Sequence, residues 1–233
     1  LSYCSGISII SQGVIMVIMD LAYLGMVLVV ILVSMTLHEA MHAFMGYFLG
    51  DDTAKAEGRL TLNPLKHIDP FMTLLLPLLL AMLGLPIFGG ARPVPFNPQR
   101  VRHGEWGAAF VALAGPLTNL FLAFLAFGMG AVSGVITSGG LIQNILVGQI
   151  ISLVVLVNLG FFVFNMLPLP PLDGSRVLYA LAPESVRRGM EWIERYGVMV
   201  VFIIIMIGQA AIGRIMTFAT NGIIQFFCMI FGV

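Results

Sequence analysis

Residues 29–48 read VVILVSMTLHEAMHAFMGYF, an apolar run that is interrupted by His38, Glu39 and His42. Side chains at positions i and i+4 lie on one face of a helix, so His38 and His42 can offer two imidazole nitrogens to one tetrahedral zinc ion. Glu39 lies beside them and can accept a proton from water on the metal. Because such polar groups are costly in a membrane helix and rarely idle, we predict a catalytic site with one Zn²⁺ per chain rather than a structural polar cluster.

The rest of the chain has the composition of a membrane protein. It is 59% hydrophobic and 9% charged, with a mean hydropathy of +1.03, whereas about a quarter of the residues of a soluble domain are charged. Several stretches approach the roughly 20 apolar residues that a spanning helix needs, namely 21–37, 107–131, 145–167 and 197–212. We therefore expect an all-α polytopic membrane protein that forms a single domain over 1–233.

The charges and cysteines exclude several classes of function. Basic and acidic residues number 11 each, so the chain lacks the basic surface that nucleic acid requires. Cys4 and Cys228 are too few and too far apart for a disulfide framework or a thiolate metal site, and we interpret both as packing residues. The stretch 5–19 lacks the features of a cleavable signal, so an interfacial or short membrane segment is expected there.

Ten of the eleven basic residues fall in three segments, which are 51–70, 90–105 and 168–195. The connection 132–140 carries no charge. By the positive-inside rule, the three basic segments should share the cytoplasmic side of a prokaryotic cell membrane, with the active site toward that side.

Two basic segments flank 71–88, so this apolar stretch cannot cross the membrane once. Its prolines and glycine suit a re-entrant hairpin, and the alternative is an ordinary short helix with weak charge bias. Segments 54–62 and 91–96 have the patterns of short edge strands. These features predict a small β or re-entrant element.

The remaining order predicts a three-helix catalytic core over about 21–176, followed by accessory membrane segments over about 185–233. The stretch 196–233 is expected to form one or two membrane segments, with Arg214 as the point of division. The three core helices are expected over 21–49, 107–131 and 141–167.

A catalytic zinc needs a third protein ligand and an open position, and Asp173 is the best candidate. It ends the stretch 165–174, NMLPLPPLDG, in which three prolines and a glycine force the backbone out of helical geometry. The alternative is that Asp173 simply caps the next helix. His67 and His103 are rival ligands, although both lie in charged loops. Asn165, just before the prolines, can bind the substrate backbone or oxyanion or bond to a neighbouring helix.

The HEAMH string at 38–42, followed by Asn-x-x-Pro-x-x-Pro-x-Asp-Gly at 165–174, resembles the site-2 protease family of intramembrane metalloproteases. The resemblance covers about 21–176. It implies a zinc endopeptidase that cuts transmembrane protein substrates within or beside the bilayer. It also implies that His38, His42 and Asp173 are the zinc ligands and that Glu39 is the general base.

Two further stretches agree with this resemblance. Residues 115–119, GPLTN, are similar to a small-residue motif on the family's intervening helix, and a packing role is expected for Gly115. No segment near 89–105 or 132–140 is long enough for a PDZ domain. In this respect the chain resembles the compact branch of the family, whose members have no PDZ domain. By the same resemblance, an exposed strand edge at 91–96, or within 71–90, can capture an unwound substrate by strand addition.

Two other classes of function explain less of the sequence. A proteolytically inactive protein that only binds helical partners predicts a damaged motif, yet all four site residues are present. Intramembrane acids and broken helices are also typical of a transporter or channel. That class of function leaves the His-Glu-x-x-His spacing unexplained.

Overall fold

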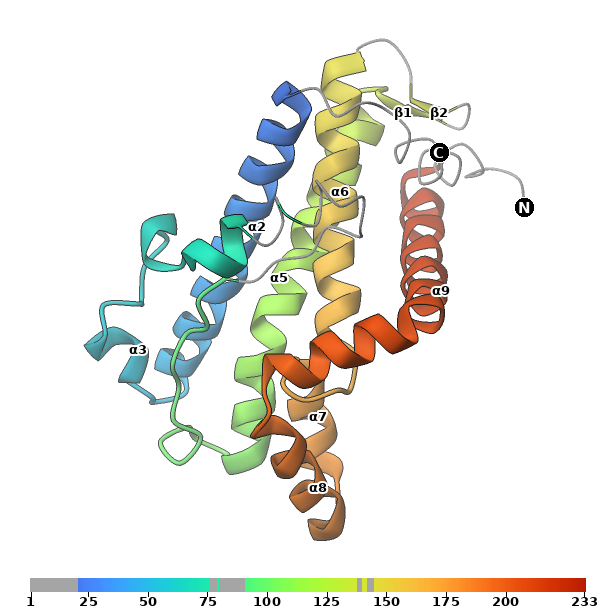
Figure 1. Cartoon of the computed structure of the whole chain (residues 1–233). Coiled ribbons are helices and arrows are strands. Elements are labelled where there is room, and N and C mark those ends of the chain that lie inside the picture. Colours follow the sequence, from blue (N-terminus) through green and yellow to red (C-terminus); the bar gives the residue numbers. More distant parts are fainter. Residues whose placement is uncertain (1–20, 76–78, 80–90, 138–139, 142–144) are drawn as a thin grey trace.

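The computed structural model describes residues 21–75, 79, 91–137, 140–141 and 145–233. Three long helices lie side by side in it (Figure 1), which are α2 (Leu21–Phe48), α5 (Gly104–Val132) and α6 (Ile145–Asn165). A fourth, α9 (Val198–Phe231), packs against α5 and α6. Within these ranges, four helices are long and apolar enough to cross a membrane, which confirms the predicted all-α integral membrane protein.

Helix α5 is the centre of the bundle because it packs against both α2 and α6. Small side chains let helix backbones approach closely in lipid, and those buried on α5 are Gly107, Ala108, Ala109, Ala112, Ala114, Gly115, Ala123, Ala126, Gly128 and Gly130. The predicted range 107–131 was a few residues shorter than α5, because the helix extends beyond its apolar run at both ends.

Aromatic side chains join α9 to α5. The ring of Phe124 lies 5.2 Å from that of Phe227 and 5.3 Å from that of Phe231, measured between centroids. Helix α9 continues through Arg214, so the segment 196–233 forms one helix rather than two.

Cys228 is buried in this aromatic cluster, but it is also disulfide-bonded. The prediction that it serves only in packing is therefore wrong, because a buried cysteine in a packed cluster can also form a covalent bond. Cys4 and the segment 5–19 lie outside the described residues.

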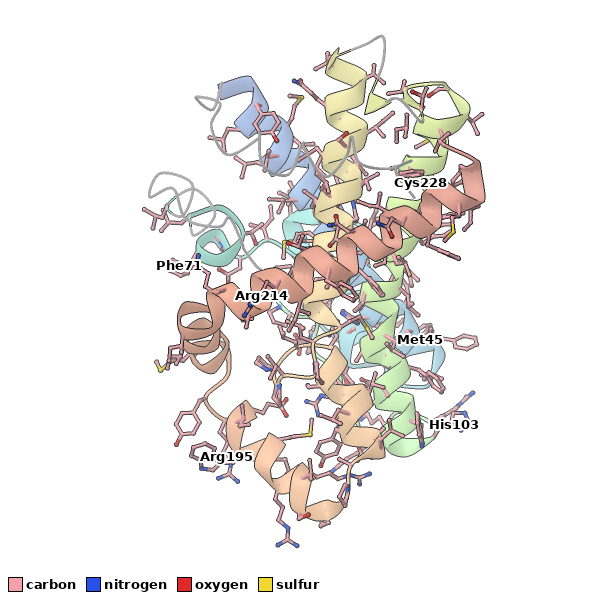
Figure 2. The ribbon with its side chains drawn as sticks, turned by 90° about the vertical axis from the view of Figure 1, so that its right-hand side faces the viewer. Met45, Phe71, His103, Arg195, Arg214 and Cys228 are labelled. Atoms are coloured by element: carbon pink, nitrogen blue, oxygen red, sulfur yellow. The ribbon has the colours of Figure 1, made fainter. Side chains whose placement is uncertain are left out.

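The short elements gather at the ends of the bundle. Helix α3, α7 and α8 lie toward one end and the hairpin of β1 and β2 toward the other (Figure 1). Figure 2 likewise shows His103 and Arg195 at one end and Cys228 toward the opposite end. The bounds are α3 (Thr53–Ala56), η2 (Pro64–Lys66), η3 (Pro70–Leu75), β1 (Ile136–Thr137), β2 (Gly140–Leu141), α7 (Gly174–Leu181) and α8 (Glu184–Glu194), with Ile136 paired to Leu141.

Neither predicted edge strand forms among the described residues. In 54–62, the chain makes α3 and then turns, because the carboxylate of Asp51 accepts hydrogen bonds from the backbone and hydroxyl of Thr53 and starts a helical turn. Residues 91–96 form neither helix nor strand, and two of them are prolines without an N–H. Most of the predicted hairpin 71–88 lies outside the described residues.

Candidate metal centre

Helix α2 places His38 and His42 one turn apart on the face toward α5. Their Nε2 atoms lie 3.0 Å apart. The Oδ2 atom of Asp173 lies 3.2 Å from Nε2 of His38 and 3.4 Å from Nε2 of His42. Three potential ligand atoms from segments about 130 residues apart thus converge on one point, and within the described part of the chain they form the one such group of three.

Asp173 reaches this point because the chain folds back after α6. Gly174 makes the reversal possible, since a Cβ there would lie 2.4 Å from the carbonyl oxygen of Met166. Asp173 occupies the N-cap position of α7 but makes no capping hydrogen bond, and its carboxylate faces the imidazoles instead. Burial alone would raise the pKa of this carboxyl, but the adjacent His42 and His38 lower it below its ordinary value.

The donor set fits zinc. Donors about 2.0–2.1 Å from a tetrahedral zinc ion lie about 3.3 Å apart, close to the three distances observed here. The Nδ1 atom of His42 lies 2.7 Å from the carbonyl oxygen of Val111. Because a carbonyl only accepts, His42 carries its proton on Nδ1 and presents a lone pair on Nε2. Two imidazoles and a carboxylate are also a typical catalytic zinc ligand set.

Gly115 makes room for this group on α5. A Cβ at this position would lie 2.4 Å from Nε2 of His42 and 2.7 Å from Cε1 of His38. Real Cβ atoms do not approach other atoms so closely, so any larger residue would enter the space of the imidazoles. Gly115 therefore has its predicted packing role directly against the two candidate ligands, although no described residue of α5 belongs to the group of ligand atoms.

Glu39 contacts the segment 91–97, which belongs to no helix or strand. The backbone N–H of Val94 donates to Oε2 of Glu39 at 2.9 Å. Nη2 of the buried Arg59 donates to the carbonyl oxygen of Arg92 at 2.5 Å, and the backbone N–H of Asn97 donates to a carboxylate at 2.6 Å. The 91–97 segment is thus fixed on both sides of the contact with Glu39.

The carboxylate that accepts a hydrogen bond from Asn97 belongs to Asp51, which lies just after the end of α2 and is 1% exposed. Burial would raise its pKa, but hydrogen bonds from Thr53 and Asn97 lower it below the ordinary value. Asp51 therefore stays ionised and anchors the 91–97 segment. Sequence reasoning missed both this anchor and the hydrogen bond from Val94 to Glu39. The contact of Val94 could not be predicted because a backbone donor leaves no side-chain signature.

Neither rival histidine belongs to the group of three ligand atoms among the described residues. His67 is buried with Nε2 at 2.9 Å from the carbonyl oxygen of Thr61, and His103 is exposed just before α5, with a φ of 70°. Asn165 ends α6, where its Nδ2 atom donates to the carbonyl oxygen of Phe161 at 3.0 Å.

Sequence reasoning also missed a partner of His38. Its Nδ1 atom lies 2.6 Å from Oδ1 of Asn119 on α5. Asn119 is fully buried, and its cost inside an apolar helix was the signal that could have identified it.

Comparisons with known proteins agree with this geometry. The model of the family described as Peptidase family M50 matches residues 26–208. YwhC of Bacillus subtilis, which bears a zinc metalloprotease name, is 36% identical over 223 residues, covering 91% of this chain and 94% of YwhC. Rip2 of Mycolicibacterium smegmatis, similarly named, is 32% identical over 81% of this chain and 70% of Rip2. No solved structure matches significantly.

The family match covers most of the chain, and its range 26–208 includes both segments of the candidate site. The resemblance drawn from the two motifs is therefore confirmed, and the chain is a membrane metalloprotease. It belongs to peptidase family M50, the site-2 protease family.

Proposed function

We propose that this protein is an intramembrane zinc endopeptidase that hydrolyses peptide bonds in or near the transmembrane segments of other membrane proteins. The observation that carries the proposal is the convergence of Nε2 of His38, Nε2 of His42 and Oδ2 of Asp173 beside Glu39. His38, Glu39 and His42 lie on a helix that is long and apolar enough to span the bilayer.

Each residue has a distinct role in the proposed reaction. His38, His42 and Asp173 would hold one zinc ion, which supplies a Lewis acid that polarises the scissile carbonyl and makes water more acidic. Glu39 accepts the proton of the attacking water and returns it to the nitrogen of the leaving amine. The N–H of Val94 holds the Glu39 carboxylate in place before the substrate arrives.

The substrate must expose a peptide bond that a transmembrane helix normally hides. We therefore propose that the substrate unwinds locally and that its extended stretch lies near the 91–97 segment, which belongs to no helix or strand. Asn165 keeps its proposed support of the substrate or oxyanion, since the hydrogen bond to Phe161 uses one of its two Nδ2 hydrogens.

Metal removal provides the test. Purified protein in detergent micelles should cleave a set of single-span substrate proteins, lose this activity with a strong chelator and regain it with added Zn²⁺. His42→Ala should bind no zinc at the same concentrations and regain nothing. Asp173→Asn, which keeps the shape but removes the charge, should lower zinc affinity and cleavage rate together.

The proposal would be overturned by wild-type activity that survives complete removal of metal, or by full zinc occupancy in folded His42→Ala. Asp173→Asn with normal zinc affinity and normal rate would remove Asp173 from the ligand set. It would then support the helix-cap alternative, because asparagine caps a helix about as well as aspartate.

We also propose that the site opens toward the cytoplasmic side of a bacterial cell membrane. The three short helices at one end of the bundle, α3, α7 and α8 (Figure 1), carry Lys55, Arg176, Arg187 and Arg188, which support this orientation. An impermeant maleimide added to intact cells should label Ser133→Cys and not Arg100→Cys, with the unsubstituted chain as background. Labelling in the reverse pattern would contradict the orientation.

A further inference from the structure

Three buried polar side chains link the three core helices behind His38. Asn119 on α5, Asn158 on α6 and Ser34 on α2 are 0%, 1% and 3% exposed. Buried polar groups in a membrane bundle need hydrogen-bonding partners, and each of these three finds its partner on another helix. We can therefore assign which atom of each side chain donates and which accepts, one residue after another, beginning with an atom that can only accept.

The fixed atom is the backbone carbonyl oxygen of Val154, which can only accept. The side-chain nitrogen of Asn158 lies 2.8 Å from it and 2.9 Å from Oγ of Ser34. If the amide were reversed, its oxygen would face the carbonyl oxygen and the two would repel. Asn158 must therefore direct Nδ2 toward α2 and its own helix, and Oδ1 toward α5.

This orientation determines the next amide. Oδ1 of Asn158 lies 2.8 Å from Nδ2 of Asn119, so Asn119 must donate to α6 and turn its own Oδ1 toward α2. That oxygen lies 2.6 Å from Nδ1 of His38. An amide oxygen only accepts, so the proton of His38 belongs on Nδ1 and the lone pair on Nε2, beside Asp173.

The two imidazoles thus reach the same state by different means. His42 donates to a backbone carbonyl, which no side-chain substitution removes. His38 depends on an amide side chain that is itself oriented by a second amide on another helix. The tautomer of His38 is therefore open to change by mutation at a residue that does not contact the histidine.

We propose that Asn158 is a positioning residue that fixes the Nδ1–H tautomer of His38 by orienting Asn119, and thereby raises the affinity of the site for zinc. The proposal rests on the proposed metal site. Outer hydrogen-bonding partners of metal ligands typically change metal affinity by about 10–100-fold. A residue that merely joined two helices would leave the tautomer unaffected.

The variants separate these roles. Asn158→Leu removes the nearer acceptor of Asn119 Nδ2 at 2.8 Å and leaves only the backbone carbonyl oxygen of Ser34 at 3.5 Å, so that this amide can rotate and donate to His38 Nδ1, which places the proton on Nε2. Asn119→Leu removes the acceptor directly. Asn119→Asp keeps an acceptor that cannot be reversed, and it should restore the tautomer in Asn158→Leu. Thr118→Val is the matched control, because it removes only the local bond of the Thr118 hydroxyl to the Ala114 carbonyl on the same helix.

Two readouts are needed. Competition with a chromophoric chelator in detergent micelles gives the zinc Kd. Long-range ¹H–¹⁵N correlation spectra of the metal-free protein report which nitrogen of His38 carries the proton. We expect Asn158→Leu and Asn119→Leu to raise Kd by about 10–100-fold and to lose the Nδ1–H signature. Asn119→Asp, the double variant and Thr118→Val should keep the signature and stay within about threefold of wild type.

An unchanged tautomer and Kd in folded Asn158→Leu would overturn the proposal. If that variant does not fold, Asn119→Asp and Asn119→Leu decide, because equal losses of affinity in both would rule out the acceptor role. A wild-type protein that binds no zinc would defeat the proposed function, whereas the tautomer of the metal-free protein would still test the assignment of Asn158.

Discussion

Replacing Glu39 by glutamine should abolish peptide hydrolysis while zinc stays bound. The three proposed ligand atoms are untouched, and glutamine keeps a carbonyl oxygen that can accept from the N–H of Val94. What is lost is the group that takes up the proton, and a positioned general base contributes about 10²–10⁴-fold to a rate. We expect a fall of that size in cleavage of a model substrate, with about one zinc per chain by metal analysis, as in wild type.

The comparison requires that wild type and Glu39→Gln be measured at equal zinc occupancy. Cleavage by Glu39→Gln within tenfold of wild type would show that another group accepts the proton. A loss of zinc together with activity would instead assign Glu39 to metal binding.

Gly115→Ala should remove the metal centre even though Gly115 has no side chain. Its Cβ would lie 2.4 Å from Nε2 of His42, so either the imidazoles move away from Asp173 or α5 moves away from α2. Movement of the imidazoles separates the ligand atoms directly, and movement of α5 would displace Asp173 with α7, which packs against α5. We expect zinc affinity to fall by at least about 100-fold, the upper end of the range for outer-sphere changes, and hydrolysis to fall below detection.

Gly160→Ala on α6 is the matched control, because a Cβ there meets nothing within 4 Å and alanine is the better helix former. It should bind zinc as wild type does. If folded Gly115→Ala retained normal zinc affinity, the close approach of α5 to the two histidines would be wrong.

The spanning helices could be predicted from sequence because lipid leaves little choice. In the membrane each helix must satisfy its own backbone hydrogen bonds, so α2, α5 and α6 follow from apolar length alone. The edge strand at 54–62 was wrong because a strand also depends on a partner, and Asp51 instead directs the chain into a turn. The start of α6 was set four residues too early because Leu141 pairs in the β-hairpin.

The candidate site divides in the same way. His38, Glu39 and His42 form a local pattern on one helix. Asp173 could be predicted because the prolines at the end of the next metal-binding segment force the backbone out of helical geometry there. The contacts of Val94 and Asn158 depend on the register between segments far apart in the chain. That register is set by packing, which hydropathy does not reveal.

The contact between the 91–97 segment and Glu39 also bears on how this protein can vary over evolutionary time. Val94 lies between Pro93 and Pro95, so its N–H is the sole backbone donor of those three residues. Because the donated group is common to every amino acid except proline, selection can hold the contact constant while the side chain at position 94 drifts. Variability at such a position among homologous sequences would therefore conceal its importance.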